Sequence, residues 1–214
     1  MDDMGYSLSA LYDLLNMNQP MTIAVLPHST FARETAQLAH QNGLEVILHL
    51  PLESINNKEE NNGTKGMIHS WMNQQEVLET VEKNLESVPH IKGANNHMGS
   101  KITASKPFME LILKFLKSRN LYFIDSRTTG QSVAYDIARS IKIPTAYRHV
   151  FLDGEVDEAY IREKMIELFR LASNKGKALG ICHPSRETMK VLRENLHLVE
   201  EYGLELVFAS QIVE

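Results

Sequence analysis

The sequence has little of several features that would define whole classes of protein. It contains one cysteine, Cys182, in 214 residues, which excludes an internal disulfide and a zinc site built on several cysteines. No apolar run approaches the roughly 20 residues of a membrane-spanning helix, and no signal peptide is visible. The formal net charge of -5 gives no electrostatic support for a nucleic-acid partner. Nor does any feature indicate an obligate protein partner.

Short apolar runs alternate with helical patterns along the chain. The runs predict strands at residues 21–26, 44–50, 91–96, 121–125, 145–152, 178–182 and 204–209. The helical patterns predict helices at 7–15, 30–41, 73–87, from 105 onward, and at 131–141, 158–174 and 186–202. Asn73 with Glu76 resembles a capping box at the start of the third helix.

Such alternation gives an α/β fold with a parallel sheet, either doubly wound or closed. Seven strands are expected and an eighth would precede Asp2, which favours a (β/α) barrel of seven or eight parallel strands. We expect one domain over residues 1–214. If residues before Met1 were removed, a strand or a signal segment could have been lost with them.

A long polar connection covers residues 51–72 and contains the run NNKEENNGTKG. Connections of this length in a compact domain are usually functional or unstructured. Pro51 is expected to end the preceding strand, so the connection would begin beside His49. Trp71, the only tryptophan, could stack on a sugar ring or pack on the barrel rim.

Acids, histidines, amides and one arginine follow most of the predicted strands. They are Asp2, Asp3, His28, His49, Asn95, Asn96, His97, Asp125, Arg127, His149, Asp153 and His183. Ligands of parallel β/α folds bind at the carboxyl ends of the strands, and scattered surface polarity would not prefer that end. The pattern therefore predicts an active site there.

The residue types at these strand ends indicate metal-dependent hydrolysis. Aspartate and histidine without cysteine suit zinc or another divalent ion held by nitrogen and oxygen. A nearby carboxylate can accept the proton of the attacking water, and a histidine across the site can protonate the leaving group. Asp2 and Asp3 suit such a division of roles, because neighbours in an extended segment point opposite ways.

Seven short motifs then resemble the divergent polysaccharide deacetylase family, part of the polysaccharide deacetylase superfamily of carbohydrate esterases. In chain order they are DDMGY, AVLPHS, LHLPLE, NNHMGS, FIDSRTT, VFLD and HP. The similarity covers essentially the whole chain, and NNHMGS and DSRTT are the specific pieces. It implies a distorted (β/α) barrel and a metal-dependent enzyme that removes N- or O-acetyl groups from a carbohydrate. The resemblance also favours a location outside the cytoplasm.

The resemblance assigns Asp2 as the catalytic base, Asp3 and His49 as metal ligands and His183 as the general acid. The superfamily completes its metal site with a second histidine four residues after the first, where this chain has Glu53. We favour His97 as the third ligand, because Pro51 alters the geometry between His49 and Glu53 and a strand end is a firmer mount than a loop. Glu53 is the alternative ligand, or it pairs with Arg127 or Lys101.

The remaining assignments concern the acid and the glycan. Asp125 and Arg127 fall where the superfamily places residues that orient the acid or bind substrate. Asn95, Asn96, Arg127 and Trp71 are expected to bind the carbohydrate or support the groups that do. Two other functions stay open: a catalytically silent barrel that binds a glycan or peptide, and an amidohydrolase acting on a small molecule.

Overall fold

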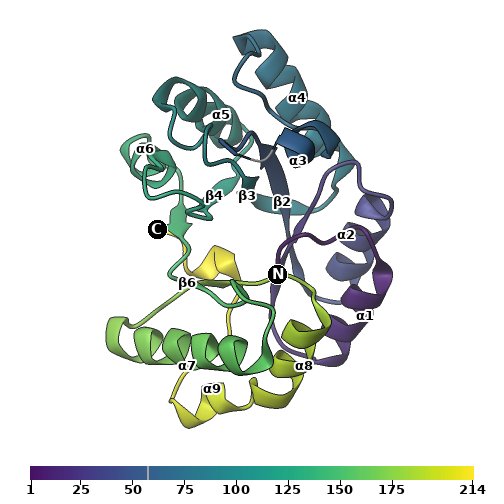
Figure 1. Ribbon diagram of the computed structural model, residues 1–214, viewed down its shortest axis with the longest axis vertical. Helices are drawn as coiled ribbons and strands as arrows, with labels where there is room; N and C mark the ends of the chain where they lie inside the picture. Colours follow the sequence, from purple (N-terminus) through teal and green to yellow (C-terminus); the bar gives the residue numbers. More distant parts are fainter. Residues whose placement is uncertain (57) are drawn as a thin grey trace.

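The computed structural model describes residues 1–56 and 58–214. Five strands form one parallel sheet in chain order: β1 (Thr22–Val25), β2 (Glu45–Leu52), β3 (Ile91–Met98), β4 (Tyr122–Asp125) and β5 (Thr145–Tyr147). A second parallel pair consists of β6 (Val150–Phe151) and β7 (Gly180–Ile181). The helices lie around the outside of the strands (Figure 1). The predicted α/β class with a parallel sheet is confirmed.

The described helices separate most successive strands, as the alternating pattern predicts, although the first precedes β1, the last two follow β7 and none lies between β5 and β6. They are α1 (Leu8–Asn16), α2 (Ala32–Gln41), α3 (Lys58–Gly63), α4 (Gln74–Ser87), α5 (Lys106–Ser118), α6 (Ala134–Ser140), α7 (Glu158–Lys175), α8 (Arg186–Asn195) and α9 (Leu198–Glu201). The capping box at the start of α4 is confirmed, with Asn73 and Glu76 each accepting a backbone N–H of the other. No helix in the described ranges is long and apolar enough to cross a membrane.

Strand β2 continues through Pro51 to Leu52, so the prediction that Pro51 ends the strand is wrong. Proline lacks only the N–H donor, and here its carbonyl is used: the Ile68 N–H donates to it over 3.0 Å. Pro51 lies beside His97 of β3 in the register. The polar connection after β2 includes the short α3, and Asn57 within it lies outside the described residues.

Two further strand predictions are wrong. Residues 145–152 form two strands rather than one, because the chain changes partner: the Arg148 N–H donates to the Asp125 carbonyl and the His149 N–H to the Leu179 carbonyl. Residues 204–209 form no strand, and a 3-10 turn, η1 (Ala209–Gln211), begins at their end. The predicted helix over 186–202 is divided into α8 and α9.

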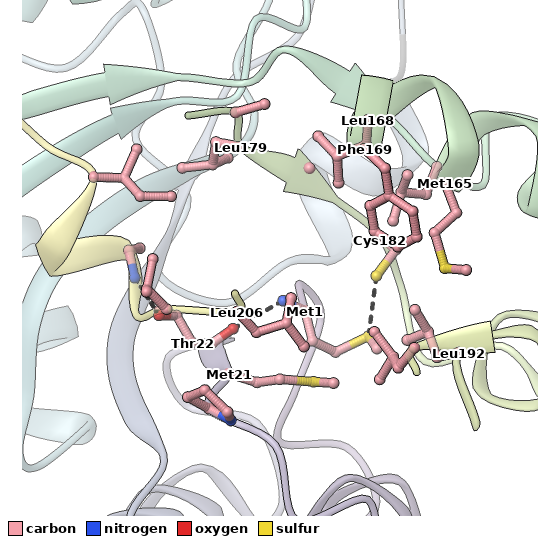
Figure 2. Close-up of a pocket in the computed structure, with 18 of the residues that line it drawn as sticks. Met1, Met21, Thr22, Met165, Leu168, Phe169, Leu179, Cys182, Leu192 and Leu206 are labelled. Atoms are coloured by element: carbon pink, nitrogen blue, oxygen red, sulfur yellow. Dashed lines mark hydrogen bonds between the residues drawn. The ribbon is translucent and has the colours of Figure 1, made fainter. Parts of the chain in front are cut away.

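An apolar cavity of about 200 Å³ lies at the amino ends of β1 and β7 (Figure 2). Met1, Met165, Phe169 and Cys182 line it, and the Met1 ammonium donates to the carbonyl of Thr22 over 2.9 Å. The Cys182 and Met1 sulfurs are 4.0 Å apart. Burial raises the pKa of Cys182 to about 12. The cavity therefore keeps a protonated thiol in an apolar setting at neutral pH.

Candidate metal centre

Three side chains converge where β2 and β3 approach their carboxyl ends. Asp3 Oδ1 lies 3.1 Å from His49 Nε2 and 3.0 Å from His97 Nδ1, and the two ring nitrogens are 3.2 Å apart. Each residue offers one ligand atom, and these atoms lie within 4.8 Å of one another. His49 lies beside Asn95 in the register, two residues before His97. Both histidines therefore project from the same face of the sheet.

Asp3 reaches this point because its backbone is left-handed. The residues on either side of Asp3 bond to the two sheets: the Asp2 N–H donates to the Cys182 carbonyl, and the Met4 N–H to the Ala24 carbonyl. Asp3 has a φ of 54°, a region that aspartate tolerates better than most residues. The expectation of an extended segment with oppositely directed acids is therefore wrong, and Asp2 and Asp3 line the same cavity.

Asn95 determines which ring nitrogen of His49 carries the proton. Its amide N–H groups donate to both carboxylate oxygens of Asp2, at 2.9 and 3.0 Å. Its carbonyl oxygen therefore faces His49 Nδ1 at 2.7 Å and accepts the proton there. In neutral His49 this leaves the Nε2 lone pair directed at Asp3, an arrangement typical of a metal-bound imidazole.

The cluster fits a cation. Asp3 Oδ1 is buried and has no hydrogen-bond donor within the described ranges, although two ring nitrogens surround it. A buried carboxylate oxygen that faces two imidazole nitrogens is stabilised by a positive charge, which a bound cation or a protonated imidazole can supply. Burial works to raise the pKa of Asp3, but His49 and His97 hold it well below its usual range. Burial likewise works to lower the pKa of His49, while Asp2 and Asp3 raise it.

His183 stands across the cavity in a pair with Asp153. The distance from His183 Nδ1 to Asp153 Oδ1 is 3.1 Å, and from His183 Nε2 to Asp3 Oδ2 it is 3.9 Å. Thr188 also donates to Asp153, over 3.0 Å. Burial works to lower the pKa of His183, but Asp153 and Asp3 raise it. Asp153 was predicted to follow a strand but had no predicted role, and that position was the signal that could have identified it.

The cavity that contains these groups has a volume of about 400 Å³. Its polar lining also includes Asn96, Ser126, Thr128 and Arg148. Asn96 is buried and bonds to the Ser126 N–H and the Met98 carbonyl, so it supports two strand ends while it faces the cavity. Arg148 was not among the predicted site residues, because it lies between β5 and β6, in the middle of a segment predicted as one strand.

Two other expected site residues lie away from this cavity. Asp125 is buried and accepts hydrogen bonds from Ser132 and from the backbone of Arg127 and Tyr135. It therefore holds the loop after β4. The Arg127 side chain is exposed and lies 4.1 Å from the centre of the Tyr147 ring.

Glu53 and Trp71 lie on the connection after β2. Glu53 pairs with Lys101 at 2.7 Å and accepts a hydrogen bond from the Ser70 N–H. Its carboxylate therefore lies outside the cluster of Asp3, His49 and His97. Burial works to raise the pKa of Glu53, and the contacts with Lys101 and Ser70 lower it. Trp71 is 71% exposed and stacks on His69, with 5.3 Å between the ring centres.

A parallel α/β fold whose strand ends gather aspartates and histidines agrees with the resemblance in the motifs. The chain belongs to the divergent polysaccharide deacetylase family, whose sequence model matches residues 1–213.

The chain is similar to three uncharacterized proteins. The chain is 34% identical to the uncharacterized protein YibQ of Escherichia coli over 99% of its own length and 65% of that relative. It is 30% identical to an uncharacterized protein of Haemophilus influenzae, over 94% of this chain and 70% of the other. The chain thus spans about two thirds of these curated relatives. A crystal structure of an uncharacterized Agrobacterium tumefaciens protein has the same fold, with a TM-score of 0.92, 23% identity, and coverage of 100% of this chain and 87% of the other.

Proposed function

We propose that the protein is a metal-dependent hydrolase that removes acetyl groups from a polysaccharide or cell-wall glycan. Asp3, His49 and His97 would hold the ion, and two histidines with one carboxylate suit zinc best. The observation that supports the proposal is the convergence of their three ligand atoms within 4.8 Å. Family membership supports the carbohydrate substrate.

The chemistry of a bound divalent ion would be to polarise the acetyl carbonyl and to lower the pKa of the attacking water. Asp2 is the base that accepts the proton of this water. Its carboxylate is buried, and the two hydrogen bonds from Asn95 fix its orientation. Asn95 therefore acts by positioning Asp2 and His49.

His183 is the general acid. Its Nδ1 faces Asp153, which leaves the opposite ring nitrogen to donate a proton to the departing sugar nitrogen or oxygen. In this mechanism Asp153 orients the acid, and Asp125 contributes only through the loop that it holds. Asn96, Arg127 and Trp71 would contact the glycan outside the reacting centre.

We also propose that both sheets belong to one distorted barrel forming a single domain over residues 1–214. The segment from Met1 to Met4 supports this, because it bonds to Ala24 in β1 and to Cys182 beside β7. The hydrogen bonds of Arg148 and His149 supply the second connection, from the end of β4 to the start of β7.

The test measures bound zinc by elemental analysis and acetate release from acetylated chitooligosaccharides and peptidoglycan. His49→Ala should lose both the metal and the activity, because it removes a ligand. Asp2→Asn should keep the metal and lose about 10²- to 10⁴-fold in rate, the usual contribution of a general base. His40→Ala, an exposed histidine on α2, is the matched control and should change neither quantity.

Undiminished metal in His49→Ala would contradict the assignment of the ligands. One observation favours a second candidate, a silent glycan-binding barrel: Glu53 stands where the superfamily carries its second histidine. Glycan binding without acetate release, across several added divalent ions, would establish that alternative.

A further inference from the structure

Arg148 is held rigidly at the wall of the candidate site. Its Nε donates to the Ser126 carbonyl over 2.7 Å and its Nη2 to the Arg127 carbonyl over 2.8 Å. The guanidinium also lies 4.4 Å from the centre of the Phe151 ring. These contacts fix the plane of the group, so its remaining nitrogen has a defined direction.

The remaining nitrogen, Nη1, makes no hydrogen bond to any residue that the structure describes. Nor does any carboxylate in residues 1–56 and 58–214 form an ion pair with Arg148. A half-buried guanidinium stays charged, and hydrogen bonds to backbone carbonyls do not neutralise it. Arg148 therefore presents a positive charge and free N–H donors to the cavity that Asp2, Asp3 and His183 also line.

The charges in the cavity with a divalent ion bound determine which substrate group Arg148 would bind. The carboxylates of Asp2 and Asp3 would balance a divalent ion, and Asp153 balances a protonated His183. Asp2 and Asp125 attract the Arg148 guanidinium, but neither forms an ion pair with it, so within the part of the chain that the structure describes Arg148 has no direct counterion. A neutral sugar hydroxyl would leave this charge without a counterion, whereas a carboxylate would supply the counterion and a charge-assisted hydrogen bond.

We propose that Arg148 selects an acidic glycan, one that carries a carboxylate on the acetylated sugar or on its neighbour. This inference rests on the proposed function, since it names the substrate class of the same cavity. The carboxylate would accept from Nη1 while the acetyl group faces Asp2 and Asp3. The specificity would come from a residue whose orientation depends on Ser126 and Arg127 carbonyls, at the end of β4.

The test compares two oligosaccharides that differ in one group: partly acetylated chitooligosaccharide, and the same material with its primary alcohols oxidised to carboxylates. Binding, measured by calorimetry, and acetate release are both followed on the zinc-loaded protein, in which the ion balances the carboxylates of Asp2 and Asp3. A hydrogen bond to a charged group contributes about 1.5–3 kcal/mol, so the wild type should prefer the carboxylated form by roughly 10- to 100-fold. Because the interaction is ionic, raising the salt concentration should reduce the preference.

Arg148→Gln should bring the ratio of the two dissociation constants to within about twofold of one, as expected when the charged hydrogen bond is lost. Arg148→Lys keeps the charge and should retain part of the preference. Arg170→Gln, an exposed arginine on α7, is the matched control and should keep the wild-type ratio. A far-ultraviolet circular dichroism spectrum identifies any variant that fails to fold, and the wild-type ratio with its salt dependence then still decides.

Equal binding of both oligosaccharides by the wild type would overturn the inference. So would an equal loss on both substrates in Arg148→Gln, which would mean that the residue acts through Asp2. If the wild type prefers the carboxylated glycan but releases no acetate from either, the proposed activity fails while the role of Arg148 stands.

Discussion

The two cavities of this protein share a wall and have opposite chemistry. Ile181 and His183 line the polar cavity, whereas Gly180 and Cys182, which alternate with them along the same segment, line the apolar one. The period-two alternation of this extended segment thus directs neighbouring residues toward one cavity or the other. The N-terminal segment contributes to both cavities without this alternation: Met1 lines the apolar one, and Asp2 and Asp3 both line the polar one.

This division predicts that each cavity can be altered without affecting the other. The largest expected effect is on the free energy of unfolding, and it comes from a residue that lines the apolar cavity. Phe169 on α7 is 4% exposed, and Phe169→Ala should lower the free energy of unfolding by about 3–5 kcal/mol through lost burial and a residual void. Urea unfolding measures the change.

Val156, 66% exposed, provides the control for Phe169: Val156→Ala should stay within about 0.5 kcal/mol of the wild type. Zinc bound per folded molecule should be the same in both variants. A drop in bound zinc for folded Phe169→Ala would break the comparison, because it would show that the two cavities are coupled.

The next effect concerns Cys182. Burial raises the pKa of its thiol from 9.0 to about 12, and only the thiolate reacts. At pH 8 the native protein should therefore label with a thiol reagent about a thousandfold more slowly than the chain unfolded in guanidinium. The labelling rate should rise as the pH rises.

The same shift has a consequence for stability. The unfolded thiol ionises near 9 and the folded one near 12, so stability should fall as the pH rises through this interval. Fast labelling of the native protein at pH 8 would contradict an apolar, closed setting for Cys182. Because Cys182 is the only cysteine, all of the thiol labelling comes from this residue.

The smallest expected effect concerns Glu53 and tests which residue is the third metal ligand. Glu53→Gln removes the carboxylate that pairs with Lys101, whose side chain is 46% exposed. A pair of this kind contributes about 1 kcal/mol or less, so stability should change little and the zinc affinity should be unchanged. A loss of zinc as large as that in His97→Gln would instead move the third ligand to Glu53.

The gathering of Asp3, His49 and His97 follows from rules that can be applied to the sequence. Parallel strands bring their carboxyl ends to one edge, and His49 and His97 lie at the ends of segments that the sequence predicts as strands. The alternation of strands and helices is equally local, and it predicted the parallel sheet. These rules depend on the spacing of apolar and polar residues within short segments, which can be read directly from the sequence.

Other features depended on distant partners. The segment 145–152 has the composition of a single strand, yet it divides because the carbonyls of Asp125 and Leu179 accept from successive backbone N–H groups, those of Arg148 and His149. Residues 204–209 have a strand-like composition, but Thr22 and Glu45 accept the N–H groups of Ala209 and Ser210 instead. The roles of Asp153 and Arg148 likewise depend on contacts 20 or more residues away, such as that between Arg148 and Ser126.

The left-handed backbone of Asp3 limits how this position can change during evolution. A φ of 54° is costly for β-branched residues and accessible to asparagine and glycine. Lineages that lose the activity should therefore carry asparagine or glycine at position 3 more often than alanine, valine or threonine. The same limit governs laboratory work: Asp3→Asn isolates the loss of a ligand charge, whereas Asp3→Val combines that loss with a backbone change.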